Sequence, residues 1–548
     1  MDLNDPDGLV NLRNLANHVA SNLPEDKKVP IVLVQGFIAW GAPLFGAINY
    51  WGGIESIPRL LMDKGYTVIV TQVGPLSSNW ERACELYRQL TVGRFNSFIP
   101  TTQEIEAHYD VDVSYGKYFD SNPVNGPRLS KTTGRRRAIL FSQSPQEYAD
   151  WKWSETSKAH FICHSQGGNT VRCLISLMIR GAGDLHAEYF GPRGRDNWAI
   201  AVTTLGTPHK GTTIIDVIDN FLLNSTDQAI KLMARLFATM SFRSPEQRDY
   251  DLQLDHWGIC RDGNETFEEM RQRLESTSGP VSKWVHSNHN GMYDNSIKGV
   301  SDLHMRAEPT SLSTYYFSLS FHSTVLFPSD WPPWTIDAIR SFPIPLVSFI
   351  REVLHSVPLI NIGVWIIDRV LEGVVNTAGW AIIPRLINIR DLVRWVTQEV
   401  LNRLLYETDY KVTLPPPGKY LPRKDTLPLM APSAYAIGGQ DLTPEQKSIL
   451  GPNLGDWYQN DGVVNTESMR GPDDSVVRDI AAFPVSDINS DGVRGIYWHF
   501  GVNDMMDHAD EVGIFIEQNT AQSMKEMYMN LATLITRLPP RKRQPSRL

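Results

Sequence analysis

The sequence predicts an α/β fold, in which a mostly parallel β-sheet is covered by helices on both faces. Two observations support this prediction. Short apolar, β-branched runs recur along the chain without polar alternation, which is typical of strands buried on both faces. Between them lie stretches whose apolar residues recur at steps of three and four, the helical spacing. With 548 residues, 42% of them hydrophobic and 21% charged, the chain has the composition of a globular protein with a sizeable core.

Strands and helices are expected to alternate along the chain. Five buried strands are expected, at 29–34, 67–70, 160–163, 198–203 and 313–319. Helical patterns lie among them, at 54–64, 80–90 and 169–178. Such alternation favours parallel strands joined by helical crossovers. No internal repeat interrupts the pattern.

The domain organisation follows from changes in composition. Residues 1–28 are interpreted as an N-terminal arm, and 29–325 and 421–538 as the two parts of one core. Between them, the segment 326–420 opens with FPSDWPPW, ends near TLPPPGKYLPRK and carries three apolar helical patterns. We interpret it as an inserted helical unit that caps the active site. A dimer contact and a membrane-surface patch are the alternatives. Residues 539–548 form a basic tail.

The net charge, the cysteine spacing and the terminal segments indicate which partners and which cellular compartment to expect. The net charge of -9 gives no reason to expect a nucleic-acid partner. The four cysteines form no C-x-x-C pair and are expected to be reduced. No secretory signal and no membrane-spanning run is recognised, so a soluble protein is expected. The final Ser546-Arg547-Leu548 resembles a peroxisomal address and predicts an intracellular, peroxisomal protein, with a frayed basic tail as the alternative.

The stretch HFICHSQGGN, residues 160–169, carries the first sign of chemistry. A strand is expected to turn directly into a helix here, which in the pattern G-x-S-x-G exposes a serine hydroxyl above the sheet. Gly167 fills the later glycine position, and Cys163 replaces the first. Ser165 is therefore a candidate nucleophile. An ordinary glycine-containing turn is the alternative.

A serine nucleophile needs a base, and the base needs an orienting carboxylate. In this architecture the order along the chain is serine, acid, histidine. His508, in MMDHADEVGI, and Asp461, on the turn-like QNDG before Val463, fit that order. His499 and Asp504 are nearby competitors.

At this point the sequence resembles a known family, the bacterial true lipases of the Geobacillus and staphylococcal type. The resemblance is carried, in family order, by PIVLVQGFIAWG, INYWGGI, VGPLSSNWERACELYRQL, CHSQGG, TTLGTPHKGTT, LQLDHWG, NDGVVNTESMRGP and MDHADEVGI. It covers nearly the whole chain except 326–420. The family implies an α/β-hydrolase fold, hydrolysis of acyl esters and a triad of Ser165, Asp461 and His508. It also implies an oxyanion hole formed by the backbone N–H groups of Phe37 and Gln166.

The resemblance carries three further expectations. No cofactor is required, but a structural divalent metal is suggested at Glu81, His108, Asp112 and Asp255, in positions similar to those of the family's zinc ligands. A hydrogen-bonded acidic cluster without metal is the alternative. Residues 213–240 are expected to form a helical lid over an apolar acyl site. In the oxyanion loop this chain has Gln35-Gly36-Phe37, whereas the family has His-Gly before the phenylalanine.

The sequence thus predicts a lipase-like serine hydrolase acting on a hydrophobic acyl ester through an acyl-enzyme on Ser165. The runner-up is an acyltransferase or thioesterase that uses the same triad on an acyl-CoA or a specialised metabolite. A non-catalytic lipid-binding protein is a third class, which the complete triad disfavours.

Overall fold

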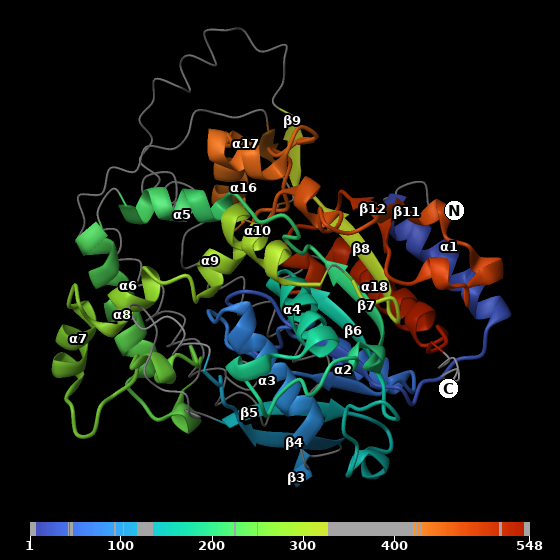
Figure 1. The fold of residues 1–548 in the computed structure, drawn as a ribbon, viewed down its shortest axis with the longest axis horizontal. Coiled ribbons are helices and arrows are strands. Elements are labelled where there is room, and N and C mark those ends of the chain that lie inside the picture. Colours follow the sequence, from blue (N-terminus) through green and yellow to red (C-terminus); the bar gives the residue numbers. More distant parts are fainter. Residues whose placement is uncertain are drawn as a thin grey trace, which may run out of the picture.

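The computed structural model describes residues 7–41, 43, 48–92, 95–101, 104–117, 135–223, 226–248, 250–308, 310–326, 420–423, 426–427, 430–514 and 518–541 (Figure 1). The predicted insertion, apart from its first and last residues, and the tail from 542 onward lie outside these ranges. The expectations attached to the insertion and to Ser546-Arg547-Leu548 therefore stay predictions.

A ten-stranded sheet forms the centre of the described part, in the order β11-β12-β8-β7-β6-β1-β2-β5-β4-β3. Its strands are β1 Ile31–Val34, β2 Val68–Val70, β3 Phe95–Thr101, β4 Glu104–Asp112, β5 Arg135–Phe141, β6 Ala159–His164, β7 Ala199–Leu205, β8 Tyr315–Phe321, β11 Val477–Asp479 and β12 Tyr497–Asn503. The strands from β11 to β2 in this order are parallel, and β5, β4 and β3 add an antiparallel edge. The α/β fold and its mostly parallel sheet are confirmed.

The described helices surround this sheet. They are α1 Asp7–Asn22, α2 Ile57–Asp63, α3 Asn79–Val92, α4 Gln166–Arg180, α5 Ile214–Leu223, α6 Thr226–Ser241, α7 Phe267–Glu275, α8 Pro280–Val285, α9 Gly291–Asn295, α10 Ile297–Arg306, α16 Ala431–Gly439, α17 Pro444–Leu450 and α18 Gln518–Ile535. Two short 3-10 helices matter for the site, η8 Thr466–Met469 and η12 Asp510–Val512.

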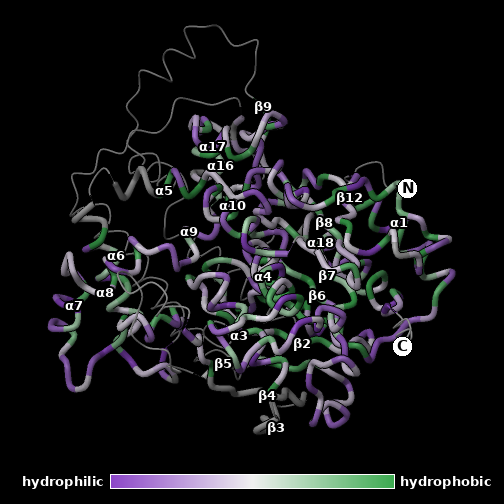
Figure 2. Tube along the Cα trace, in the orientation of Figure 1, coloured by the Kyte–Doolittle hydropathy of each residue, from purple (hydrophilic) through white to green (hydrophobic). Residues whose placement is uncertain are grey.

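The two faces of the sheet bury separate hydrophobic cores, because successive strand residues point to opposite sides. In β1, Ile31 and Leu33 join the core under α1, α2 and α18. Val32 and Val34 join the core under α3 and α4. Figure 2 shows hydrophobic residues on the central strands and mostly hydrophilic ones on the outer loop beside α7. Burial on both faces explains why these strands read as continuous apolar runs.

All five expected strands are present and adjacent in the sheet, and the three helical patterns correspond to α2, α3 and α4. The segment 1–28 differs from the expected arm: its helix α1 packs against α18 and β12 as part of the core. The edge strands β3, β4 and β5 and the late strand β12 lacked a recognised signal, since they carry charged or polar residues such as those of RRRAILF in β5.

The two ends of the predicted insertion meet in a short antiparallel ribbon. Strand β9 (Thr324–Leu326) pairs with β10 (Tyr420–Pro422), so that Leu326 lies opposite Tyr420. The chain therefore leaves and re-enters the described part at one place. Among the described helices, none is long and apolar enough to cross a membrane. Cys84, Cys163, Cys173 and Cys260 are free thiols, as expected.

Candidate active site

Ser165 lies on a sharp turn between β6 and α4. Its backbone has φ 55° and ψ -132°, a conformation that costs energy for a residue with a side chain and is typical of a nucleophile elbow. The two following glycines are sterically required. A Cβ on Gly167 would lie 2.4 Å from the carbonyl oxygen of Val34, and one on Gly168 would lie 2.3 Å from Thr207 Oγ1. The local sequence thus forces the tight strand-to-helix turn.

His508 and Asp461 form a buried pair at the same edge of the sheet. His508 Nδ1 lies 2.7 Å from Asp461 Oδ2, and the His508 backbone N–H donates to the Asp461 carbonyl at 2.9 Å. The other carboxylate oxygen of Asp461 accepts from the backbone N–H groups of Val463 and Val464 at 2.8 and 2.7 Å. The turn that the sequence presents as QNDG therefore fixes the carboxylate, which in turn orients the imidazole.

The pair lies beside the nucleophile. His164, the residue before Ser165, has its ring centroid 4.4 Å from that of His508. The two competitors of the predicted pair lie elsewhere. His499 is a buried residue of strand β12 with Nδ1 3.3 Å from the Ser318 carbonyl, and Asp504 is exposed. The structure thus brings Asp461 and His508 together near Ser165, although 296 to 343 positions separate them from it along the chain.

The oxyanion loop, residues 35–37, approaches Ser165 closely. A Cβ on Gly36 would lie 2.6 Å from Ser165 Cβ and 3.1 Å from its Oγ, so only glycine fits there. Gln166 begins helix α4, where the first backbone N–H groups have no partner within the helix. Phe37 follows Gly36 and is half-buried. Both predicted donors, Phe37 and Gln166, therefore belong to segments that border the nucleophile.

Arg82 fixes this loop, a role that the sequence did not reveal. Its guanidinium is buried and donates to the carbonyls of Gln35 and Gly36, the latter at 3.0 Å. It also donates to the carbonyl of Gly74 at 3.0 Å and to Thr170 Oγ1 at 2.8 Å. The Gly36 carbonyl and the Phe37 N–H belong to one planar trans peptide and point in opposite directions. Holding the carbonyl therefore sets the direction of the oxyanion donor.

The electrostatic environment suits a base held by a carboxylate. Burial disfavours the charged form of His508, but the neighbouring carboxyl groups, first Asp461 and then Glu511, together outweigh burial and raise the pKa of the imidazole. Burial lowers the pKa of His164, which stays neutral. Of these two neighbouring rings, His508 is therefore the one that accepts a proton.

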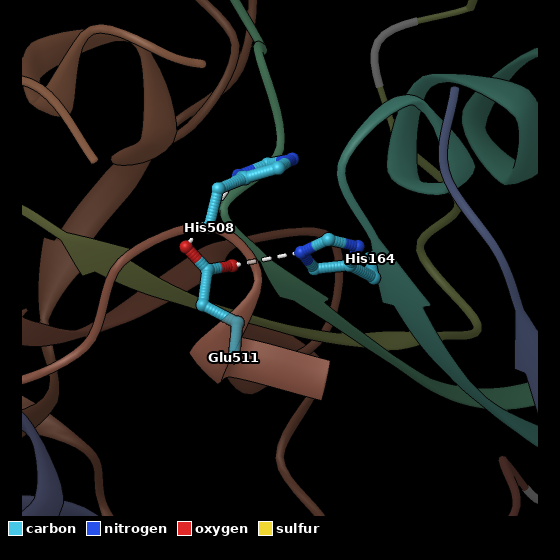
Figure 3. Close-up of side chains that lie close together, drawn as sticks. All are labelled: His164, His508 and Glu511. Carbon is cyan, nitrogen blue, oxygen red and sulfur yellow. Dashed lines mark ion pairs between the residues drawn. The ribbon is translucent and has the colours of Figure 1, made fainter. Parts of the chain in front are cut away.

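Two groups beyond the predicted triad complete the polar cluster. Tyr50 Oη lies 2.6 Å from His164 Nδ1 and accepts from the Gly36 N–H at 3.2 Å. Glu511, in η12, lies between His164 and His508, and the donor atoms of these three residues fall within 4.8 Å of one another (Figure 3). The only signal of Glu511 in the sequence is its position three residues after His508, which places both on one turn.

The predicted metal ligands that the structure describes do not fit a divalent ion. Glu81 hydrogen-bonds to His256, accepts from Trp257 Nε1 at 3.1 Å and accepts twice from Ser78 at 2.7 Å. Asp255 forms a two-bond ion pair with Arg248, with both distances 2.7 Å. Both carboxylates are thus already satisfied by protein groups.

The remaining two suggested ligands, His108 and Asp112, lie on strand β4, opposite Ile139 and Arg135 of β5. Their side chains are outside the described part. The family pattern implied a shared ion, but Arg248 supplies a positive charge where an ion would be needed. No step of the chemistry below therefore passes through a metal.

The predicted lid region, 213–240, corresponds to α5 and α6, two helices rather than one. Its start is joined to the catalytic-acid turn: Thr212 Oγ1 donates to the Val463 carbonyl at 2.6 Å, and the Thr213 N–H donates to Asn465 at 2.9 Å. Phe237 of α6 packs on Trp284 of α8 at 5.6 Å. The motion of these helices stays a prediction.

Comparison with known proteins agrees with this geometry. A model of the family described as the lipase-like C-terminal domain matches residues 145–328. The matched region contains Ser165 and ends before Asp461 and His508. The Staphylococcus hyicus lipase is 29% identical over 313 residues, and a Staphylococcus epidermidis lipase is 27% identical over 312. These matches span 55% and 54% of this chain but only 42% and 38% of the relatives.

Solved structures share the fold over almost the whole chain. The crystal structure of Staphylococcus hyicus lipase matches with a TM-score of 0.57 and 19% identity, covering 94% of this chain and 97% of that one. EstA from Clostridium botulinum matches with a TM-score of 0.56 and 20% identity, covering 98% and 100%. In sequence and in fold, this chain is similar to the bacterial lipases of staphylococcal type, and its architecture is that of the α/β-hydrolase fold.

Proposed function

We propose that the protein hydrolyses carboxylic acyl esters through an acyl-enzyme on Ser165. The observation that carries the proposal is the buried His508–Asp461 pair beside a serine held at φ 55° on a strand-to-helix turn. Geometry of this kind serves a nucleophile, and an ordinary turn gains nothing from the strain. The relatedness to lipases supports the same assignment.

The reaction follows from the positions of the groups. His508 takes the hydroxyl proton of Ser165 as the oxygen attacks the ester carbonyl, and Asp461 stabilises the resulting imidazolium. The backbone N–H groups of Phe37 and Gln166 stabilise the negative charge that develops on the carbonyl oxygen. His508 then gives its proton to the departing alcohol. In the second half of the reaction, His508 takes a proton from water as the water oxygen attacks the carbonyl of the acyl-enzyme. His508 then returns this proton to the Ser165 oxygen, and the carboxylic acid is released.

The proposed substrate is a hydrophobic ester. The names of the relatives support a lipid-like acyl group, and the apolar helix α5 begins beside the catalytic-acid turn. Transfer of the acyl group to another acceptor, the runner-up from the sequence, uses the same intermediate. No contact among the described residues favours such an acceptor over water.

The test is intact-mass spectrometry after treatment with a fluorophosphonate, together with turnover of p-nitrophenyl esters of graded acyl length. Wild type is expected to gain one adduct and to hydrolyse the esters, and Ser165→Ala to lose both. Ser176→Ala is the matched control, because Ser176 is a buried serine of α4, the helix that follows Ser165, and its hydroxyl accepts from the Glu308 N–H.

Turnover that survives Ser165→Ala would overturn the mechanism. Labelling of wild type and release of p-nitrophenol with negligible formation of the free carboxylic acid, but with acyl transfer to an added alcohol, would convert the assignment to an acyltransferase. Absence of labelling in a folded wild type would favour the non-catalytic, lipid-binding class.

A further inference from the structure

A second carboxyl group, that of Glu511, lies beside the catalytic histidine. Its side chain is fully buried. One oxygen, Oε1, lies 3.6 Å from His508 Nδ1, and the other, Oε2, lies 3.1 Å from His164 Nε2 (Figure 3). The mechanism proposed above uses Asp461 alone and leaves this buried acid without a role.

The position of the Glu511 carboxyl is fixed by its surroundings. Gly206, at the end of β7, has φ +54°, and a Cβ there would lie 2.2 Å from Glu511 Oε2. The Glu511 backbone N–H donates to the Asp507 carbonyl at 3.1 Å, and its carbonyl accepts from Tyr528 Oη at 2.9 Å. A glycine therefore makes room for this carboxyl, and the backbone on both sides of it is anchored.

His508 Nδ1 carries one proton and has two carboxyl groups within reach. Asp461 is nearer, at 2.7 Å against 3.6 Å for Glu511, and its second oxygen is held by two backbone amides. Asp461 is thus the partner in the resting enzyme. Two carboxylates this close cannot both stay ionised in a buried site, and the less favoured one keeps its proton.

Glu511 is the group that keeps the proton while Asp461 is charged. Burial, together with the neighbouring charge of Asp461, raises the pKa of Glu511 well above its usual range. The titratable groups facing it are His164 from β6, His508 from the loop after β12 and Asp461 from the turn before η8. Neutral His164 has Nε2 3.1 Å from Glu511 Oε2, and Tyr50 Oη lies 2.6 Å from its other ring nitrogen, Nδ1.

We propose that Glu511 is a positioning residue for His508, a second carboxylate that takes over the Nδ1 proton when Asp461 is lost. The inference rests on the proposed hydrolase function. Removing Asp461 removes the like charge that, together with burial, keeps Glu511 neutral, while the neighbouring His508 continues to favour the ionised carboxylate. Glu511 then ionises, and a small rotation of the His508 ring brings Nδ1–H to Oε1.

The test compares Asp461→Ala, Glu511→Gln and the double variant with wild type. In triads with a single acid, losing the acid lowers kcat by about 10⁴-fold. Asp461→Ala is expected to lose only about 10²-fold, and Glu511→Gln less than about tenfold, because each leaves one carboxyl on Nδ1. The double variant is expected to lose about 10⁴-fold, more than the product of the single losses.

The pH profile of kcat/KM separates positioning from mere support of the fold. In Asp461→Ala the ionised Glu511 still favours the imidazolium, whereas in the double variant only burial acts on His508. The acidic limb of kcat/KM is therefore expected at least about one pH unit lower in the double variant than in Asp461→Ala. Loss of a purely structural residue would lower the rate and leave this limb in place.

Asp507→Asn in the Asp461→Ala background is the matched control. Asp507 is another buried acid of the same turn, and it accepts from the backbone N–H groups of Ala509 and Asp510, both at 3.0 Å. Adding Asp507→Asn to Asp461→Ala is expected to lower the melting temperature without lowering kcat/KM any further. A control that reproduces the double variant in rate and pH limb would overturn the inference.

The two proposals fail in different ways. If Ser165→Ala retains turnover, the hydrolase mechanism itself is wrong. If Ser165→Ala is inactive but Asp461→Ala and the double variant have equal rates and equal pH limbs, the hydrolase stands and Glu511 is not a second carboxylate for His508.

Discussion

Arg82 provides the sharpest test of how the oxyanion loop is held. Its guanidinium reaches four acceptors in different directions: the carbonyls of Gln35, Gly36 and Gly74 and the hydroxyl of Thr170. Burial lowers the pKa of Arg82 to about 10, which still leaves it charged at neutral pH. Substitution by lysine keeps the positive charge but replaces the planar guanidinium, whose donors point in several directions, by a single ammonium group.

The magnitude follows from the contacts. One ammonium group cannot span the four acceptors, so at least two of them lose their donor. Each buried acceptor left without a partner costs about 1–3 kcal/mol of stability. The Gly36 peptide is then free to rotate, which turns the Phe37 N–H away from the oxyanion. Loss of one oxyanion donor lowers kcat by about 10²–10³-fold, so Arg82→Lys is expected to lower it by between about tenfold and 10³-fold.

The assay is ester turnover together with the second-order rate of fluorophosphonate labelling, since both pass through an oxyanion. The two rates are expected to fall by the same factor, with KM nearly unchanged. Arg172→Lys is the matched control, because Arg172 is a buried arginine of α4 that pairs with Asp474 and does not touch the oxyanion loop. Arg82→Lys protein that is folded and has kcat/KM within about twofold of wild type would refute the reasoning.

Three further predictions concern charge. Because Asp461 raises the pKa of His508, the acidic limb of kcat/KM is expected above about pH 6.5, and a limb below that value in a pH-rate profile would contradict the pairing. Burial raises the pKa of Asp294 to about 7, so the folded protein binds this proton more tightly than the unfolded chain and stability falls as pH rises toward 7. Asp294→Asn is expected to flatten that fall in melting temperature between pH 5 and 8, and an unchanged slope would count against it. Because Glu81 and Asp255 already have protein partners, addition of zinc or EDTA is expected to shift the melting temperature by less than about 1 °C. A rise of several degrees with zinc would instead support a metal site at these residues.

The catalytic centre could be predicted from the sequence where its signals are local. The elbow around Ser165 depends on steric demands within six residues, because Gly167 and Gly168 must let the helix pass close to Val34 and Thr207. The parallel strands could be predicted because burial on both faces makes them continuous apolar runs. Asp461 and His508 were assigned through the resemblance, since an aspartate on a turn and a histidine in a loop are by themselves ordinary.

Tertiary structure decided what depends on contacts between distant segments. Arg82 reads in the sequence as one charge on an amphipathic helix, and only the fold places it under the carbonyls of residues 35 and 36. At Glu81 and Asp255, where the resemblance suggested an ion, folding brings His256 and Arg248 to the two carboxylates.

Glu511 shows most clearly what the sequence determines and what only the tertiary structure decides. The sequence determined that an acid stands three residues after His508. It could not determine that His164, 347 positions earlier, would face the same carboxyl across the end of the sheet. Hydrophobic patterning acts locally and is visible along the chain, whereas the pairing of buried polar groups is set by which strand ends meet, and that is a property of the folded sheet.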